Sequence, residues 1–227
     1  MEAIILTGGL GTRLRSRLKD RPKAMALVGG RPFLELLFDR LIQGECDRII
    51  LSVGYLRDVI IRHFGSSYRD VPIDYVIEEA PLGTGGAIRL CLPHARGSDV
   101  VVMNGDTFLD INYRTMFAAH QVGKAVMTMA VAKVLDVGRY GGVLLNGDRI
   151  AAFTEKGNQG AGWINAGVYV LRRDFPWPAS LGPRFSFEQE ILHQSTFAIQ
   201  SFLCHGFFLD IGIPEDLDRA QTELKGK

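Results

Sequence analysis

The sequence predicts an α/β fold with a doubly wound, mostly parallel sheet, helices on both faces and a strand-rich second part. Continuous apolar runs rich in β-branched residues alternate with amphipathic segments through the first half. A glycine-rich loop follows the first of these runs, and short strands separated by turn residues fill the second half. The 227 residues, 47% of them hydrophobic, suit a single domain with a full core.

In the first half, each apolar run is followed by a segment with helical spacing. Apolar residues recur at that spacing from Phe33 to Leu41, behind a proline that suits the first turn of a helix. Ligands of parallel sheets bind beyond the carboxyl ends of the strands, where Glu78 and Asp106 fall. The expected strands are Ala3–Thr7, Arg48–Val53, Ile73–Ile77 and Val100–Met103, and the expected helices are Pro32–Gln43, Arg57–Phe64 and Thr84–Leu92.

The second half has a different pattern, with strands predominating. A hairpin is expected to turn at Asn146-Gly147-Asp148, because this turn separates two short apolar runs. Ser186-Phe187-Glu188-Gln189 has the spacing of a capping box and predicts a helix through Leu192. The expected strands are Lys124–Lys133, Tyr140–Leu145, Arg149–Thr154, Trp163–Leu171 and Phe197–Phe202, and a last helix is expected at Pro214–Glu223.

Composition and charge exclude several classes of protein. A net charge of +1 gives no general attraction to nucleic acid or to a membrane surface. Cys46, Cys91 and Cys204 are widely spaced, form no CxxC motif and are expected to be reduced thiols rather than disulfide or zinc ligands. No apolar run approaches the ~20 residues of a membrane span, and no secretion signal is evident at the N-terminus. We therefore expect a cytoplasmic protein.

The loop from Gly8 to Leu14 is the most informative motif. Its glycines let the backbone approach a bulky anion closely and turn free N–H groups toward phosphate oxygens. Arg13 and Lys23 add positive charge where a polyphosphate would lie. The loop is not a P-loop, which requires Gly-Lys-Ser/Thr, and Leu14 replaces the third glycine of the dinucleotide fingerprint. A nucleotide-triphosphate site is thus favoured over a nicotinamide-dependent oxidoreductase.

Gly8–Leu14 followed by Arg21-Pro22-Lys23 resembles the signature of the sugar-1-phosphate nucleotidylyltransferases, and the similarity continues from Ile4 to about Ala220. The resemblance implies a Rossmann-like fold of the nucleotide-diphospho-sugar transferase type. It also implies a reaction in which a sugar 1-phosphate oxygen attacks the α-phosphorus of a nucleoside triphosphate and releases pyrophosphate. Residues 1–122 would form the nucleotide-binding half and residues 123–227 the sugar-phosphate-binding half.

The resemblance also implies the residues of the nucleotide site. Arg13, Lys23 and Asp106 would be catalytic, since two cations and a carboxylate-bound metal neutralise the charge that accumulates at the α-phosphorus. Asp106 and Asp210 would hold Mg²⁺ through hard oxygen ligands. Ile213 stands where the family often has threonine, so no hydroxyl ligand is expected there. The expected nucleotide-binding residues are Leu6, Gly8, Gly9, Gly11, Thr12, Arg13, Lys23, Glu78, Gly83 and Thr84.

The identity of Glu78 bears on the choice of base. Relatives that use uracil or thymine nucleotides carry glutamine here, and its amide can both donate and accept. A carboxylate can only accept, and guanine alone offers it two adjacent donors, N1–H and N2–H₂. The sequence therefore favours GTP. The neighbouring Glu79 is expected to face solvent, and a shift of one residue in the alignment would exchange the two.

The resemblance places sugar-phosphate contacts largely in the second half. Lys156 would pair with the phosphate, Glu155 and Asn165 would bind hydroxyls, and Gly141 would let the sugar ring approach the backbone. Gly157 stands where relatives frequently have proline. The expected sugar-phosphate-binding residues are Asn104, Gly141, Glu155, Lys156, Asn165 and Gly167.

Two segments narrow the resemblance further. Pro81–Ala87 and Asp210–Asp216 are most similar to the short bacterial guanylyltransferases that act on D-glycero-α-D-manno-heptose 1-phosphate. The alternatives are a mannose-1-phosphate guanylyltransferase, a uridylyltransferase for an amino-sugar 1-phosphate, and a non-catalytic homologue that senses nucleotides. Arg172–Phe187, with its aromatic residues among prolines, is interpreted as a pocket wall, a lid or a homodimer contact, or else as an apolar cluster packed under a loop.

Overall fold

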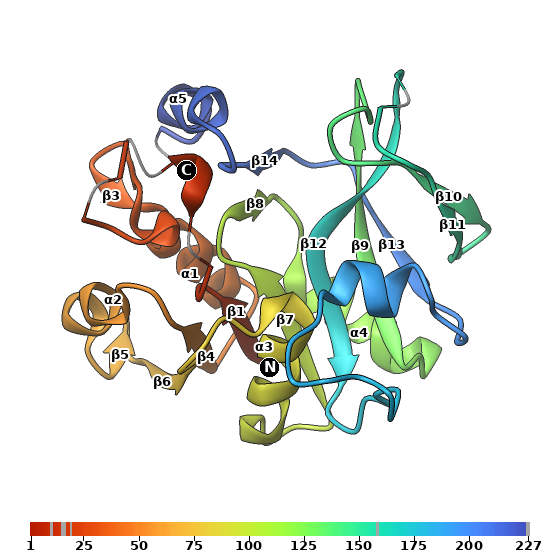
Figure 1. Cartoon of the computed structure of the whole chain (residues 1–227), viewed down its shortest axis with the longest axis horizontal. Helices are drawn as coiled ribbons and strands as arrows, with labels where there is room; N and C mark the ends of the chain where they lie inside the picture. Colours follow the sequence, from red (N-terminus) through yellow and green to blue (C-terminus); the bar gives the residue numbers. More distant parts are fainter. Residues whose placement is uncertain (10, 15–16, 19, 158, 226–227) are drawn as a thin grey trace.

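The computed structural model describes residues 1–9, 11–14, 17–18, 20–157 and 159–225, with Thr12 described by its backbone alone. Within these residues one ten-stranded sheet crosses the molecule in the order β10-β11-β13-β9-β12-β7-β1-β4-β6-β5 (Figure 1). Its strands are β1 (Glu2–Leu6), β4 (Arg48–Val53), β5 (Ser67–Tyr68), β6 (Val71–Ile77), β7 (Asp99–Asn104), β9 (Met127–Val134), β10 (Val143–Asn146), β11 (Arg149–Phe153), β12 (Gly162–Arg172) and β13 (Gln200–Cys204). Two small antiparallel pairs join β2 (Leu27–Val28) to β3 (Arg31–Pro32), and β8 (Thr107–Leu109) to β14 (Phe208–Asp210).

Helices connect most strands of the first half. The α-helices are α1 (Phe33–Gln43), α2 (Arg57–Phe64), α3 (Gly83–Cys91), α4 (Tyr113–Gly123) and α5 (Pro214–Glu223). Shorter turns are η1 (Thr12–Leu14), η2 (Lys23–Met25), η3 (Leu92–His94) and the π-helical η4 (Glu188–Leu192). Among the described residues, no helix has the length and apolar character needed to cross a bilayer.

The sheet is mixed, and this corrects the prediction of a mostly parallel sheet. Parallel pairing is confirmed for β6, β4, β1 and β7, where Ile4 lies opposite both Ile50 and Val102. In the second half β12 runs antiparallel to both β7 and β9, and β10 and β11 form the expected hairpin. The physical reason differs between the strands: β10 and β11 are joined by a tight turn, which only antiparallel strands can use, while β12 and β13 reach their partners through longer connections, and β13 pairs parallel to β9.

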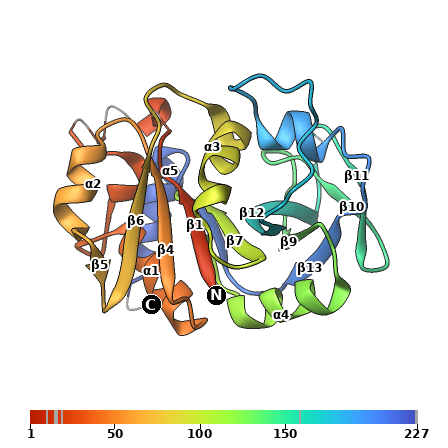
Figure 2. The same ribbon diagram turned by 90° about the horizontal axis from the view of Figure 1, so that it is seen from below.

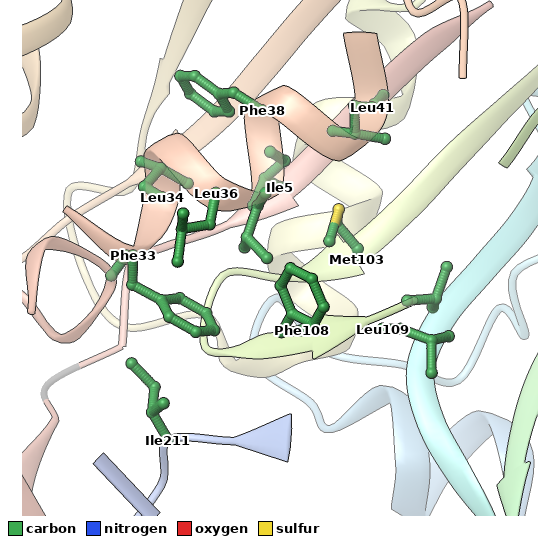
Figure 3. Close-up of a cluster of buried hydrophobic side chains, with 14 of the residues drawn as sticks. Ile5, Phe33, Leu34, Leu36, Phe38, Leu41, Met103, Phe108, Leu109 and Ile211 are labelled. Atoms are coloured by element: carbon green, nitrogen blue, oxygen red, sulfur yellow. The ribbon is translucent and has the colours of Figure 1, made fainter. Parts of the chain in front are cut away.

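Successive residues of the central strands enter two separate apolar cores. Ile5, together with Leu51 and Met103, packs in the core that contains α1 (Figure 3). Ile4 points to the opposite face and packs in the core that contains Ile88 of α3. Helices therefore cover both faces of the sheet, as predicted, and Figure 2 shows α1 and α3 on either side of β1 and β4.

Several boundaries and elements differ from the predictions. The helix expected after Ser186 is a π-helical turn, and Glu190 rather than Gln189 accepts from the Ser186 N–H, at 2.9 Å. The strand predicted at Phe197–Phe202 lies at Gln200–Cys204, while α4 and the β2–β3 and β8–β14 pairs were not predicted at all. The strands of these two pairs are two or three residues long, too short for a hydrophobic period to reveal them.

The end of the chain returns to the first half. β14 pairs with β8, and Gln221 of α5 accepts a hydrogen bond from the Gly29 N–H (3.1 Å) and donates to the Leu27 carbonyl (2.5 Å). Figure 1 shows α5 beside β3, across the molecule from β10 and β11. The residues from Phe208 onward thus lie against structure that precedes residue 122, and this brings Asp210 to the first half.

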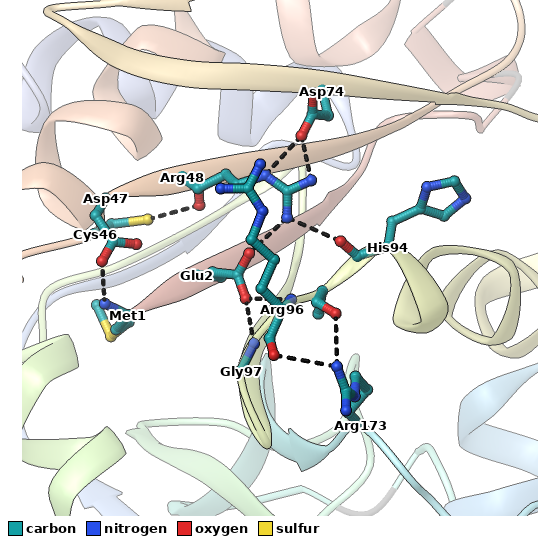
Figure 4. Close-up of polar contacts among 11 residues, drawn as sticks. Met1, Glu2, Cys46, Asp47, Arg48, Asp74, His94, Arg96, Gly97 and Arg173 are labelled. Atoms are coloured by element: carbon teal, nitrogen blue, oxygen red, sulfur yellow. Dashed lines mark hydrogen bonds and ion pairs between the residues drawn. The ribbon is translucent and has the colours of Figure 1, made fainter.

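A polar network closes the opposite end of the sheet (Figure 4). Buried Glu2 accepts from the N–H groups of Arg96 (2.6 Å) and Gly97 (2.7 Å) and from Arg48 Nη1 (2.5 Å). Arg48 Nε also donates to Asp74 at 2.6 Å. Burial alone would raise the pKa of Glu2, but these hydrogen bonds outweigh it and lower the pKa. The network joins the first residues of β1 and β4 to the middle of β6.

The three cysteines are free and buried, in agreement with the prediction of reduced thiols. Burial raises the pKa of Cys46 to about 11 and that of Cys91 to about 12. Both side chains therefore stay protonated at neutral pH and act as small apolar groups.

Candidate active site

Most of the residues predicted for the nucleotide site gather where β1, β6 and β7 end. The glycine loop leaves β1, Glu78 follows β6, and Gly105-Asp106 follows β7. The Gly105 N–H donates to the Leu6 carbonyl at 2.9 Å, and a Cβ at Gly105 would lie only 2.7 Å from that oxygen. The close approach of the two strand ends therefore requires glycine at this position.

A cavity of about 320 Å³ opens beside the glycine loop. Arg13 and Lys23 both line it, together with Asp106, so the two predicted cations face one cavity. The side chain of Thr12 falls outside the described residues. The lining residues are Leu6, Thr7, Gly9, Gly11, Arg13, Leu14, Lys23, Ala24, Gly105, Asp106 and Gly212.

Asp106 and Asp210, distant in sequence, both lie close to Lys23, and Asp106 is the one of the two that lines this cavity. Lys23 Nζ forms an ion pair with Asp106 and lies 3.8 Å from Asp210 Oδ1. The contact arises because β14 pairs with β8 and the Ile211 N–H donates to the Asp106 carbonyl at 2.9 Å. Burial raises the pKa of Asp210, the charge of Asp106 raises it further, and Lys23 opposes both effects.

The chemistry of this carboxylate pair fits a divalent cation. Asp210 Oδ1 is buried and has no hydrogen-bond partner among the described residues, although a buried acceptor normally has one. Two carboxylates offer the hard oxygen ligands that Mg²⁺ prefers. The described residues contain no third acidic, histidine or cysteine side chain grouped with them, so phosphate oxygens and water would complete the coordination.

Arg139 is a nearby charged residue that was not among the predicted site residues, although it begins a segment, Arg139–Val143, that resembles a sugar-phosphate segment of the family. It forms an ion pair with buried Asp216 at the start of α5, and its charge acts on the pKa of Asp210. Its guanidinium lies over the Tyr140 ring, 5.1 Å from the centroid. Arg139 thus connects the start of α5 and the surroundings of Asp210 with Tyr140.

A second cavity, of about 310 Å³, shares Leu6, Gly9 and Asp106 with the first. It extends past Asn104 to Glu78 and to the first turn of α3. Its lining residues are Leu6, Gly8, Gly9, Glu78, Pro81, Gly83, Thr84, Ala87, Asn104, Asp106 and Arg184. All the predicted nucleotide-binding residues except Thr12 therefore line these two connected cavities.

Glu78 is a buried carboxylate, 9% exposed. It accepts from Ser52 Oγ at 2.7 Å and from the Leu82 N–H at 3.4 Å, and a Cβ at Gly8 would overlap its Oε1. No ion pair links it to a cation within the described part of the chain. Each carboxylate oxygen can accept more than one hydrogen bond, so Glu78 retains acceptor capacity toward the cavity.

The hydroxyl of Thr84 is engaged by a distant segment. It donates to Glu188 Oε2 at 2.6 Å and accepts from the Phe187 N–H at 2.9 Å. Gly83, with φ of 71°, lies in the left-handed region, and a Cβ there would be 2.5 Å from the Phe185 carbonyl oxygen. The Gly-Thr step thus serves first to dock residues 183–188 on α3.

Residues 183–188, at the end of the segment Arg172–Phe187 and just beyond it, dock on α3 and bring one residue, Arg184, to the lining of the second cavity. The N–H groups of Gly85 and Gly86 donate to the Phe185 carbonyl, at 3.1 and 3.3 Å, and the Phe185 N–H donates to Leu82. The rings of Phe175, Trp177, Phe185 and Phe187 pack on one another. Among the interpretations of Arg172–Phe187, the structure supports the packed apolar cluster, from which Arg184 alone reaches the lining of the second cavity.

Gly86→Ala tests this docking. We expect it to lower the free energy of unfolding by about 1–3 kcal/mol, because its Cβ would lie 2.5 Å from the Pro183 carbonyl oxygen, and overpacking outweighs the better helix propensity of alanine. Gly182→Ala is the control, since no atom lies within 4 Å of the position that its Cβ would occupy and a change within ~0.5 kcal/mol is expected. Urea denaturation measures both, and equal stability of the two variants would contradict tight docking.

A third cavity, of about 310 Å³, lies in the second half. Gly141, Glu155, Lys156 and Asn165, four of the residues predicted to bind the sugar phosphate, all line it. Its lining residues are Tyr140, Gly141, Gly142, Val143, Phe153, Thr154, Glu155, Lys156, Asn165, Glu188, Gln189, Leu192 and His193.

Two predicted sugar-phosphate residues lie elsewhere. Asn104 lines the second cavity. Gly167 packs against the Asn104 side chain, because a Cβ added at Gly167 would lie 2.7 Å from Asn104 Nδ2. Asn165 remains in the third cavity but is held locally, since it donates to the Tyr169 hydroxyl (2.7 Å) and accepts from the Gly167 N–H (2.9 Å). Asn104 therefore lines the second cavity while it packs against Gly167 of the second half.

Glu188, Gln189 and His193 were not predicted as site residues. They come from the π-helical turn η4 and the residue after it, and His193 stacks on the Phe153 ring at 4.9 Å. Glu188 also bonds to Thr84, so it links the second cavity to the third. The capping-box pattern located this turn in the sequence, but a local pattern does not reveal which cavity a turn lines.

Comparison with known proteins places these cavities in context. The family model described as nucleotidyl transferase matches residues 2–225. The chain is 42% identical to a D-glycero-alpha-D-manno-heptose 1-phosphate guanylyltransferase of Aneurinibacillus thermoaerophilus, covering 99% of both chains. It is 32% identical to a mannose-1-phosphate guanylyltransferase of Mycobacterium tuberculosis, covering 99% of this chain and 64% of that protein.

A solved structure is similar over the whole chain. The crystal structure of HddC from Yersinia pseudotuberculosis complexed with GMP-PN has a TM-score of 0.87 and 36% sequence identity, and the match covers 99% of each chain.

Proposed function

Because the chain belongs to the nucleotidyl transferase family, we propose that it is a guanylyltransferase that condenses GTP with D-glycero-α-D-manno-heptose 1-phosphate to give a GDP-heptose and pyrophosphate. The observation that carries the choice of base is Glu78, a buried carboxylate without a cation partner among the described residues. It lines the cavity next to the one that contains the glycine loop, Arg13 and Lys23. The N1–H and N2–H₂ groups of guanine would satisfy this carboxylate.

The proposed reaction needs no covalent intermediate. An oxygen of the sugar 1-phosphate attacks the α-phosphorus, a new P–O bond forms, and the bond to the β-phosphate oxygen breaks as pyrophosphate leaves. The N–H groups of the glycine loop bind the triphosphate, and Arg13 and Lys23 stabilise the charge on the five-coordinate phosphorus. The protein contributes by aligning two anions and offsetting their repulsion.

Asp106 and Asp210 would hold Mg²⁺, which when bound supplies positive charge against the phosphates. Lys156 would pair with the phosphate of the sugar, with Glu155 and Asn165 on its hydroxyls and Gly141 beside the ring. Residues 1–122 are assigned mainly to the nucleotide and residues 123–227 mainly to the sugar phosphate. For the fold we propose the Rossmann-like, doubly wound arrangement, on the basis of its parallel central strands. We place the enzyme in the cytoplasm, where GTP is available.

Mannose 1-phosphate is the second candidate substrate, because the mycobacterial relative named for it is also similar along the length of this chain. The two sugars share the ring and differ in the exocyclic carbon chain. Gln189 and His193 line the third cavity together with the predicted phosphate and hydroxyl ligands, and we propose that the exocyclic chain lies against these two residues.

A matrix of nucleotides against sugar 1-phosphates tests the proposal. GTP, UTP, CTP, dTTP and ATP are each combined with a set of hexose and heptose 1-phosphates. We expect pyrophosphate release to be fastest for GTP with the heptose 1-phosphate. Glu78→Gln is expected to lower kcat/KM for GTP by roughly 10- to 100-fold. The amide has one oxygen acceptor, and its NH₂ group would face the second guanine donor. The matched control is Glu79→Gln, at an exposed acid 82% accessible. A wild-type preference for UTP would overturn the guanine proposal.

A further inference from the structure

We propose that Arg184 is a specificity residue that donates hydrogen bonds to O6 and N7 of guanine while Glu78 accepts from its N1–H and N2–H₂. The inference rests on the proposed use of GTP and adds a second, independent group that selects the base. Arg184 lines the same cavity of about 310 Å³ as Glu78, Gly83 and Thr84, and its side chain is exposed.

The guanidinium of Arg184 is available to a ligand. No hydrogen bond or ion pair joins it to another residue in the described part of the chain, whereas Arg89 of α3 donates to the Leu181 and Gly182 carbonyls. An arginine offers five N–H donors in a planar fork and cannot accept. In this cavity it is therefore the donor counterpart of Glu78, which can only accept.

The backbone that carries Arg184 is held firmly on both sides. Phe185 is bonded to the first turn of α3 through its N–H and its carbonyl group. Arg89 of α3 donates to the Gly182 carbonyl at 2.5 Å, and its guanidinium lies 4.8 Å from the Phe185 ring centroid. A free side chain on a fixed backbone loses less conformational freedom on binding than one on an unrestrained loop.

The chemistry of the bases favours guanine for this pair of residues. Guanine presents two donors, N1–H and N2–H₂, next to two acceptors, O6 and N7. Arginine binding O6 and N7 is the commonest specific contact to guanine in nucleic-acid recognition. Adenine has an amino donor in place of O6, and its N1 carries no hydrogen. Its amino group would therefore face the donors of Arg184, and its N1 would face the acceptors of Glu78. Uracil, thymine and cytosine lack N7.

A phosphate-binding role fits Arg184 less well. The cavity beside the glycine loop already has Arg13 and Lys23, and Arg184 does not line it. Arg184 lines the neighbouring cavity, on which Glu78 also borders. A cation that bound the triphosphate would affect every nucleotide equally, whereas a cation that binds O6 and N7 affects guanine nucleotides alone. The two roles therefore give different results with base analogues.

The test compares wild type and Arg184→Ala with GTP, ITP, 7-deaza-GTP and ATP in the pyrophosphate assay. In the wild type, loss of N7 in 7-deaza-GTP is expected to lower kcat/KM roughly tenfold. Arg184→Ala is expected to lower kcat/KM for GTP by roughly 10- to 100-fold and to remove the penalty for 7-deaza-GTP. The penalty for ITP, which lacks only the 2-amino group, should persist in Arg184→Ala because Glu78 still binds that edge.

Two further variants separate geometry from charge. Arg184→Lys retains the charge but loses the fork, so we expect it to behave like Arg184→Ala toward 7-deaza-GTP. Arg62→Ala removes an exposed arginine from α2 and should leave every ratio at its wild-type value. If Arg184→Ala keeps the wild-type ratio of GTP to 7-deaza-GTP, or loses equally with all nucleotides, the assignment of Arg184 is wrong. A wild-type enzyme that prefers UTP overturns both this assignment and the guanine proposal.

Discussion

Lys23→Ala is expected to lower kcat by about 10²–10³ with little effect on the folded state in the presence of Mg²⁺. Lys23 is 18% exposed, lines the cavity beside the glycine loop and pairs with Asp106. A fixed positive group aimed at charge that develops during reaction is worth this much in an enclosed site. No other described lysine lines this cavity, so a neighbouring ammonium cannot replace it.

Steady-state kinetics and urea denaturation measure the two effects of Lys23→Ala separately. We expect the free energy of unfolding with Mg²⁺ present to change by about 1 kcal/mol or less, since the metal then neutralises the carboxylates that Lys23 pairs with. Lys133→Ala, at an exposed lysine of β9, is the control and should retain full activity. Unchanged turnover of Lys23→Ala would remove Lys23 from the mechanism.

Asp106→Asn is expected to lower kcat by about 10²–10³ and to raise the Mg²⁺ concentration needed for half-maximal rate. Asparagine keeps the shape of the side chain but withdraws one negative charge from the pair that would hold the cation. Asp210→Asn should act in the same direction, and the double variant should lose less than the product of the two single losses because both residues serve one ion.

The stability of Asp210→Asn gives an independent measure of the same site. Burial and the charge of Asp106 raise the pKa of Asp210 in the folded state. The ionised form of Asp210 therefore lowers the free energy of unfolding. This destabilisation is fully present above the folded-state pKa and absent below the unfolded-state pKa. Asp210→Asn should therefore be at least as stable as the wild type at neutral pH without Mg²⁺. Asp148→Asn, in the exposed β10–β11 turn, is the control for both kinetics and stability. An unchanged Mg²⁺ titration in Asp106→Asn would contradict the metal site.

The sequence predicted the local structure of the first half well. The helix at Pro32–Gln43 was expected from its apolar spacing and is observed as α1, with Pro32 immediately before it. The strands that become β1, β4, β6 and β7 were recognised as continuous apolar runs, and the parallel pairing of these four is confirmed. These features depend on neighbours a few residues apart, which a single sequence displays directly.

One helix was missed although the sequence contained a signal for it. Asn112 caps α4, and its side chain accepts from the Thr115 N–H at 2.9 Å. Tyr113, Met116 and His120 are the buried residues of this helix, and the first two are spaced by a helical turn. The other residues of this segment are mostly polar or small, so the apolar spacing of a helix is weak. The N-cap residue Asn112 was therefore the clearest sign of where the helix begins.

By itself, the sequence determined the chemical inventory of this protein: a glycine loop with two cations, a carboxylate after each of two strands, and the family to which it belongs. Tertiary structure decided which of these groups meet. It brings Asp210 to Asp106 through the β8–β14 pair, and Arg184 to the cavity of Glu78 by docking residues 183–188 on α3. The physical reason is that periodicity and turn preference act over a few residues. Contacts between distant segments depend instead on which packing of the whole chain buries the most apolar surface while leaving the fewest polar groups unpaired.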